Sequence, residues 1–252
     1  MATWLSALAF TRRNLTNFFL SRFALVGVLM VPMVLLIALG TLYSRAVDAT
    51  GISYMDFLVP GICMQAAMFA AIASAWTLAA DRVSGFHRAA LIFAGAPQTI
   101  VSGRILTDLC KYGMALIVIV AVGVVLGFRI HCGALEAILA LVLLMAFAAV
   151  CSLAYVAVGC RIRSLRLVEG VTMAPFPVLF LLSTAISPLE NYPSWLQPLI
   201  HATPVSVVSE AVRGLLEAKS SSLLPALLWL AGASAVFGVL ALRGLRTFRE
   251  VS

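Results

Sequence analysis

The chain has 252 residues, of which 63% are hydrophobic and 11% are charged. A typical soluble domain is about 45–50% apolar and about 25% charged, so a soluble fold of this composition would lack polar side chains to cover its core. The same apolar excess excludes intrinsic disorder. The net charge of +7 does not indicate nucleic-acid binding, because cytoplasmic loops of membrane proteins collect Lys and Arg. The composition predicts an all-α, polytopic membrane protein.

The N-terminal segment, residues 1–22, predicts an interfacial helix. At 100° per residue, five large apolar side chains fall within one arc of about 100°: Trp4, Leu8, Leu15, Phe18 and Phe19. Arg13 points roughly opposite. Such a helix lies flat at the lipid headgroups, with its rings buried and with Arg12 and Arg13 near the phosphates. The helix serves either as a membrane anchor or as a platform for a cytoplasmic partner, and the sequence leaves both open.

Six stretches of low charge are long enough to cross the ~30 Å hydrocarbon layer as helices. The third charge-free run, Tyr112–Phe128, is the shortest, and we extend it to residue 106 because Lys111 can snorkel. The predicted spans lie near residues 23–44, 57–80, 106–128, 137–160, 170–189 and 220–242. Because the six charge-free runs contain no Asp, Glu, Lys or Arg, a proton motor inside this chain is not expected.

Basic residues favour one set of loops. Thirteen of the 17 Lys and Arg residues precede the first span, follow the second and fourth spans, or lie in the tail, and the other loops hold four. The positive-inside rule therefore places both termini in the cytoplasm. An even number of spans, six, fits this alternation.

The cytoplasmic loop after the second span, residues 81–111, is divided by Gly85 and Pro97. Residues 86–94 can form a short helix, and a second helix can run from Pro97 into the third span. A short helix lying across the cytoplasmic ends of spans can transmit a push as a rigid lever. An ordinary cytoplasmic loop is the alternative.

The outer loop between the fifth and sixth spans, residues 190–219, is broken by prolines. Tyr192 and Trp195 suit the membrane interface. Thr203 followed by Pro204 predicts a helix start, with the hydroxyl as cap and the proline in the first turn. The segment predicts either a half-buried structure that closes the outer end of a transport path or a surface lid.

No enzyme motif is visible. His87, His131 and His201 lie in three loops on both sides of the predicted membrane, so they cannot form one site. The sequence contains no GxxxxGK[ST] phosphate loop, no GxSxG and no HExxH motif. The five cysteines include no CxxC pair, and no metal site is expected. If the protein performs work, another chain supplies the energy.

The two loops resemble those of ABC-2-type exporter membrane subunits, most closely the daunorubicin-resistance branch, which includes drug and complex-lipid exporters. The inner loop carries an acid, a glycine, an arginine, a proline and a Gly-Arg pair: Asp81, Gly85, Phe86, Arg88, Pro97, Gly103 and Arg104, followed by Asp108. The outer match is more specific: Pro188, Tyr192, Pro193, Trp195, Leu196, Gln197, Pro198, Pro204 and Arg213. Where relatives have more charge before the proline, residues 91–96 of this chain are apolar or glycine, which suggests an apolar socket.

This resemblance implies six spans in the plasma (inner) membrane of a bacterium, and a translocator built from two permease copies or from this chain and a paralogue. Two separate ATPase subunits would bind ATP and Mg²⁺, and this chain would hold no cofactor. The inner-loop helix would couple the ATPase to the spans, and residues 190–219 would form an extracellular re-entrant segment near the outer gate. Substrates would be hydrophobic or amphipathic: lipids, glycolipids or apolar drugs. The alternatives are a membrane-embedded lipid-modifying enzyme and a non-transporting immunity or assembly protein.

Overall fold

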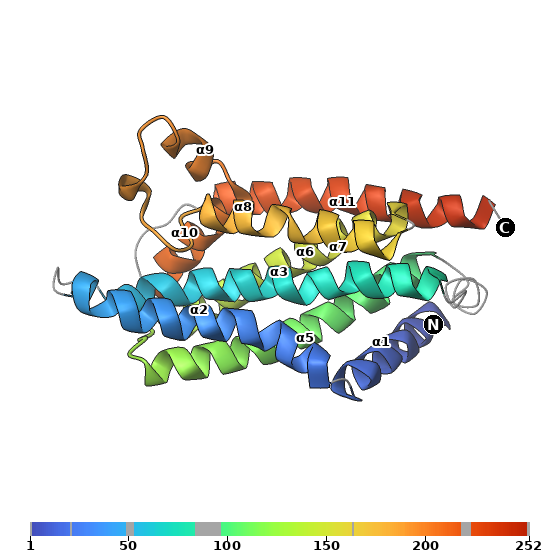
Figure 1. The fold of residues 1–252 in the computed structure, drawn as a ribbon, viewed down its shortest axis with the longest axis horizontal. Helices are drawn as coiled ribbons and strands as arrows, with labels where there is room; N and C mark the ends of the chain where they lie inside the picture. The colour runs from blue at the N-terminus through green and yellow to red at the C-terminus, as the bar shows by residue number, and fades with distance from the viewer. Residues whose placement is uncertain are drawn as a thin grey trace.

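The structure is a computed structural model that describes residues 2–20, 22–48, 53–83, 97–162, 164–217 and 223–250. All of its regular elements in these ranges are helices, which confirms the all-α prediction (Figure 1). The elements are α1 (Ala2–Leu20), α2 (Arg22–Asp48), α3 (Tyr54–Val83), α5 (Pro97–Val125), α6 (Ala134–Arg161), α7 (Leu165–Met173), α8 (Pro175–Leu181), the short 3-10 helix η1 (Leu189–Asn191), α9 (Gln197–His201), α10 (Pro204–Leu216) and α11 (Leu224–Glu250).

Five helices in the described ranges are long and apolar enough to cross a membrane, which confirms a polytopic membrane protein. Their candidate spans are Val26–Tyr43, Tyr54–Asp81, Gln98–Val125, Ala134–Arg161 and Leu224–Gly244. Figure 1 shows both termini toward one end of the bundle and α9 and α10 at the other. We call these the inner and outer ends, after the predicted orientation. The location of both termini in the cytoplasm stays a prediction.

The predicted fifth span, residues 170–189, is not one helix. Its first part belongs to α7 and α8, which meet at Ala174, and a turn over residues 182–187 follows. Pro175 and Pro177 lack the backbone N–H that would continue the helical ladder across this junction. The count of six spans therefore stays a prediction.

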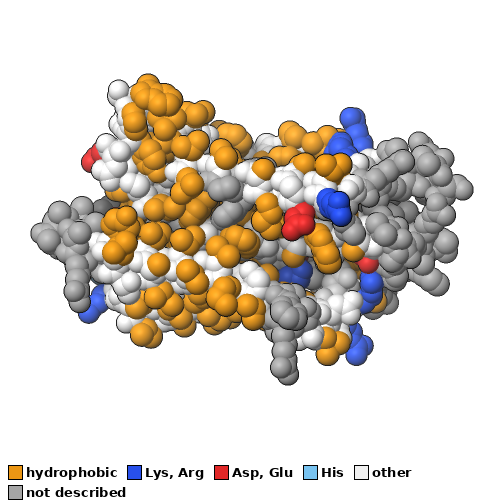
Figure 2. Space-filling view, viewed as in Figure 1, with side chains coloured by type: hydrophobic (Ala, Val, Ile, Leu, Met, Phe, Trp, Pro, Cys, Tyr) orange, Lys and Arg blue, Asp and Glu red, His pale blue; other side chains and the backbone are white. Residues whose placement is uncertain are grey.

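Helix α3 is the central element of the bundle. Within its candidate span 83% is buried, compared with 22% in the span of α2 and 17% in the span of α11. Helix α3 therefore forms the core of the bundle, and the other two helices lie at its periphery. It packs against α2, α5, α6, α7 and α10. Figure 2 shows hydrophobic side chains over the middle of the visible face, with Lys and Arg gathered toward the inner end. An apolar outer surface of this kind matches a lipid environment.

Gly61 on α3 permits a close backbone approach. A Cβ atom at this position would overlap the carbonyl oxygen of Ala185, in the turn that follows α8. Since this obstacle is backbone and not the end of a flexible side chain, no rotamer change relieves it. The outer part of α3 and the turn at 182–187 are therefore fitted to each other.

We predict that Gly61→Ala lowers stability by about 1–3 kcal/mol, because overpacking outweighs the gain of about 1 kcal/mol in helix propensity. Thermal unfolding in detergent measures this. Gly232→Ala on α11 is the matched control, since a Cβ there meets no atom within 4 Å, and it should be neutral or stabilising. Equal unfolding temperatures for both variants would contradict the prediction.

Candidate functional site

The inner end of the bundle contains a buried arginine, Arg104 of α5, with an exposed fraction of only 2%. Its Nη2 atom donates to Oδ2 of Asp81 at 2.7 Å, and its Nη1 atom donates to Oγ1 of Thr77 at 2.8 Å. Arg13 of α1 contacts the other carboxylate oxygen of Asp81 at 3.4 Å. The Asp81 carboxylate therefore joins α1, α3 and α5. Removing one partner of such a buried ion pair destabilises a protein by far more than forming the pair stabilises it.

Helix α1 packs on α5 beside this arginine. The Thr11 hydroxyl donates to the Gly103 carbonyl at 3.1 Å, and a Cβ at Gly103 would lie 3.1 Å from the Ala7 oxygen. The Phe10 ring lies under Arg104, with 5.6 Å between the ring centroid and Cζ. The Gly-Arg pair thus has two roles. The absence of a side chain at Gly103 allows α1 to pack closely on α5, and Arg104 binds Asp81.

The packing of α1 differs from the predicted surface helix. Ala7, Thr11 and Phe18 are buried against the protein, whereas Leu8 and Phe19 are exposed. One edge of the predicted apolar arc therefore faces the bundle, and the other edge remains free to face lipid. Arg12 is exposed. The side chain of Trp4 lies outside the described residues.

A second buried cluster lies further along α5, around Asp108. Its Oδ2 atom accepts hydrogen bonds from the hydroxyls of Ser74 on α3 and Ser152 on α6, both at 2.6 Å. Its Oδ1 atom lies 3.2 Å from Nζ of Lys111. The ammonium group also lies 5.3 Å from the centroid of the Phe18 ring of α1. This cluster therefore connects α1, α3, α5 and α6.

Three charged residues, Arg104, Asp108 and Lys111, lie within the candidate span of α5, Gln98–Val125, just before the charge-free run. Helix α5 is continuous from Pro97 to Val125, and a span of about 20 residues counted back from its end includes Asp108 and Lys111. The two charges neutralise each other, and the serines satisfy the carboxylate. Ser74 and Ser152 therefore act as hydrogen-bond donors to Asp108 and not only as helix-packing residues. The signal available in the sequence was the i,i+3 spacing of Asp108 and Lys111 beside an apolar run.

The predicted coupling residues fall into two groups. Asp81 lies near the end of α3, while Gly103, Arg104 and Asp108 lie on α5, whose first residue is Pro97. Much of the loop predicted at residues 81–111 is therefore helix. The other three coupling residues, Gly85, Phe86 and Arg88, lie outside the described residues.

At the outer end, Arg213 of α10 connects three elements. Its Nε atom donates to the Phe57 carbonyl at 3.0 Å, and Nη2 donates to the carbonyls of Thr184 at 2.6 Å and Ala185 at 3.1 Å. Its Cζ atom lies 3.6 Å from the centroid of the Phe57 ring. Burial lowers the pKa of the Arg213 guanidinium to about 10, while Glu210 and Glu217 oppose that shift. The group stays protonated at neutral pH, so these carbonyls hold a full positive charge.

Hydroxyl groups reinforce this contact between the turn and α10. The Ser206 hydroxyl accepts from the Thr184 backbone N–H at 2.9 Å, and the Thr184 hydroxyl donates to Oε1 of Glu210 at 3.1 Å. Thr203 caps α10 by accepting from the Ser206 N–H at 3.3 Å, which confirms the predicted helix start at Pro204. The backbone groups of Phe57 and Thr184 that bond to Arg213 and Ser206 were not identified from the sequence, because backbone groups leave no residue-type signal.

The proline-rich motif folds around Tyr192. Its hydroxyl donates to the carbonyls of Leu181 at 3.0 Å and Ser183 at 3.1 Å. The Gln197 amide donates to the Tyr192 carbonyl at 2.9 Å. Pro188 precedes η1, the Pro193 carbonyl accepts from the N–H of Leu196 at 2.8 Å, and Pro198 lies in the first turn of α9.

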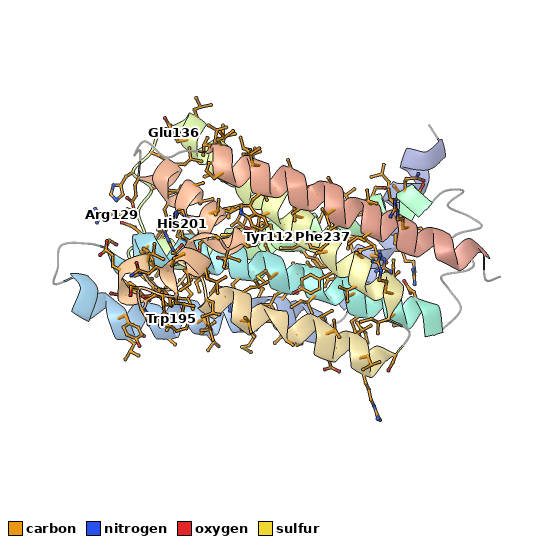
Figure 3. All side chains as sticks on the ribbon, turned by 90° about the horizontal axis from the view of Figure 1, so that it is seen from above. Tyr112, Arg129, Glu136, Trp195, His201 and Phe237 are labelled. Carbon is orange, nitrogen blue, oxygen red and sulfur yellow. The ribbon has the colours of Figure 1, made fainter. Side chains whose placement is uncertain are left out.

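Trp195 is largely exposed, with 77% of its surface accessible. Figure 3 shows Trp195 and His201 at the outer end, whereas Tyr112 lies midway along the bundle.

The comparison with known families decides the classification. The family model of the ABC-2 type transporter matches residues 6–216. The chain belongs to this family. It is therefore a multi-pass membrane permease, as the two loops suggested.

Three similar proteins are transporter permeases. Over 194 residues the chain is 28% identical to the daunorubicin resistance ABC transporter permease protein DrrB1 of Streptomyces coeruleorubidus, covering 76% of this chain and 68% of the relative. Over 232 residues it is 26% identical to the probable doxorubicin resistance ABC transporter permease protein DrrC of Mycobacterium tuberculosis, covering 91% and 84%. A third relative, doxorubicin resistance permease protein DrrB of M. tuberculosis, is 30% identical over 160 residues, covering 64% and 55%.

We predict that Asp108→Asn destabilises the protein by about 3–5 kcal/mol, because the Lys111 ammonium is left buried without its counter-charge. The double variant Asp108→Asn with Lys111→Met should recover most of that loss, since no uncompensated charge remains. Thermal unfolding of the three proteins in detergent measures both effects. A single variant as stable as the wild type would refute the assigned ion pair.

Proposed function

We propose that the chain is the permease subunit of an ATP-driven exporter, and that a separate ATPase subunit supplies the energy. ATP and Mg²⁺ would bind on that ATPase, and this chain would hold no cofactor. A second copy of this permease, or a paralogue, would complete the translocator in the bacterial plasma (inner) membrane, with both termini in the cytoplasm. The drug-resistance names of the relatives support export as the direction.

The observation that carries this proposal is the position of the Asp81 carboxylate. Helix α3 ends at Val83 and α5 begins at Pro97, so the two helices flank the segment proposed to meet the ATPase. Asp81 binds Arg104 of α5 and Arg13 of α1 just inside that segment. A displacement of the segment therefore moves three helices together. At the other end of α3, the turn at 182–187 and α10 contact the same helix and would form the outer gate.

The proposed substrates are hydrophobic or amphipathic molecules, such as lipids, glycolipids or apolar drugs. Anthracyclines, the drugs named for the relatives, are the first probes to use. Beyond Lys111, α5 carries no charged residue, and α3 carries none between Asp56 and Asp81. A path along these helices thus suits molecules with large apolar parts. Transport would proceed by alternating access, in which ATP binding on the partner favours one of two arrangements of the spans.

An intramembrane lipid enzyme is less well supported. Ser74 and Ser152 are buried, and both hydroxyls donate to the same oxygen of Asp108. In this arrangement the serines stabilise a carboxylate and are not presented to a lipid substrate.

We predict that Asp81→Asn weakens binding of the ATPase subunit or uncouples ATP hydrolysis from export, because the neutral amide no longer holds Arg104 and Arg13 by charge. Co-purification with the ATPase and ATP hydrolysed per daunorubicin exported measure the two effects. The control is Asp56→Asn, at the opposite end of α3, whose carboxylate accepts from the Arg129 N–H at 2.8 Å and contacts His131 at 3.4 Å. The control should keep both properties. Normal coupling in Asp81→Asn would remove the coupling role.

We predict further that Trp195→Ala lowers daunorubicin export while the amount of inserted protein and its unfolding temperature stay near wild type. The side chain is 77% exposed, so its removal should change stability by no more than about 0.5 kcal/mol. Export assays normalised to membrane protein level measure this. A parallel loss of insertion and export would favour a purely structural role for the indole.

A further inference from the structure

Gln65 is a buried polar side chain near the middle of α3. Its exposed fraction is 0%, and neither Nε2 nor Oε1 has a hydrogen-bond partner among the described residues. A buried carboxamide without partners is unfavourable, and most buried polar groups avoid this state. Other polar side chains on the same helix are bonded: Ser74 to Asp108, Thr77 to Arg104, and Asp81 to two arginines. The isolation of Gln65 therefore requires a physical reason.

The register of α3 shows which neighbour Gln65 faces. Four residues earlier, Gly61 lies against Ala185. Seven residues later, Ile72 belongs to the same buried cluster as Val168 of α7. At 100° per residue, positions 61, 65 and 72 lie within an arc of about 40°. Gln65 therefore lies on the face of α3 that is turned toward α7 and the turn at 182–187, between these two contacts.

The segment formed by α7 and α8 is the break in the helical bundle. Helix α7 ends at Met173 and α8 begins at Pro175, so the two pieces can change their relative angle without unwinding a continuous helix. The turn at 182–187 connects α8 to α10 through the bonds of Thr184 and Arg213. A movement of α8 and this turn away from α3 would uncover Gln65, within an otherwise apolar surface.

We propose that Gln65 is a substrate-binding residue. When α8 moves away from α3, the carboxamide donates to a carbonyl of the passing amphipathic molecule or accepts from its hydroxyl. This inference rests on the proposed export function and adds a contact point to it. In the closed arrangement the amide has no partner among the described residues, because the group that bonds to it belongs to the transported molecule. The free-energy cost of burying the unbonded amide favours opening when that molecule is present.

Tyr112 provides a matched control. Its hydroxyl is also buried without a partner among the described residues. It lies four residues after Asp108, on the face of α5 that packs against α3 and α6 through Ser74 and Ser152. This face lies away from the broken segment. Tyr112→Phe therefore removes an equally isolated polar atom without altering the surface that would be uncovered.

The test is daunorubicin binding to the purified full-length chain in lipid nanodiscs, followed by fluorescence anisotropy. This measurement requires no ATPase, so failure of the proposed energy coupling does not affect it. Gln65→Leu should weaken binding about three- to tenfold, the effect of one lost neutral hydrogen bond, without lowering the unfolding temperature. Tyr112→Phe should leave the affinity unchanged, and Gln65→Asn should recover part of it.

Two results would overturn the proposal: unchanged affinity in Gln65→Leu, or a lower unfolding temperature, which would show that the amide has a partner within the protein. If wild-type protein does not bind daunorubicin, the anthracycline part of the proposed function fails, and accessibility then decides on Gln65. In a variant whose five native cysteines are alanines, Gln65→Cys should react with a maleimide in membranes when the complex is trapped with ATP and vanadate. Reaction of this cysteine with the maleimide in the trapped complex supports the proposal for a different transported molecule. Complete protection of the cysteine from the maleimide overturns the proposal.

Discussion

The carboxylates of Asp81 and Asp108 lie among apolar helices, where a charge without a partner is strongly unfavourable. Each is therefore matched by residues on other helices: Asp81 by Arg104 and Arg13, and Asp108 by Lys111, Ser74 and Ser152. Because lipid tails are as apolar as leucine side chains, burial of apolar surface does not determine which faces of membrane helices associate. These polar contacts determine the faces that pack together, and they fix the register of α1, α3, α5 and α6 at the inner end.

The outer end is connected in a different way. There the positive charge of Arg213 is held by backbone carbonyls and an aromatic face, not by a carboxylate within salt-bridge distance among the described residues. Both ends converge on α3, the most buried of the candidate spans. Helix α3 flanks the proposed coupling segment at one end and contacts the turn at 182–187 at the other, so it physically connects the two ends of the bundle. Its two ends are held by separable sets of bonds, which is what alternating access requires.

The sequence predicted the long helices well, because a span needs only length and apolar composition, and both can be read directly. It also predicted the cap at Thr203, which depends on local chemistry. It did not predict the break between α7 and α8, because an apolar run that contains Pro175 and Pro177 is compatible with a kinked span or with two helices. The surroundings of the helices decide between these, and no local pattern records them.

The buried clusters were harder to foresee for a related reason. Arg104 and Asp108 were expected to be coupling residues from the family resemblance, but their partners lie on α3 and α6, which only the packing reveals. Reading Asp108 and Lys111 as part of a cytoplasmic loop followed from the usual avoidance of charge in spans. That rule concerns unpaired charges, and a neutral pair with two hydroxyl ligands satisfies it. Residues 84–96 lie outside the described ranges, so the proposed lever between α3 and α5 stays a prediction.

The bonds of Arg213 have a consequence for how this protein can evolve. Its three acceptors are main-chain oxygens of Phe57, Thr184 and Ala185, and a main-chain oxygen is present whatever side chain occupies the position. Substitutions at 184 and 185 can thus accumulate without compensating changes at 213. Statistical covariation between these positions should then be weak although they touch, and methods that infer proximity from paired substitutions would overlook this contact.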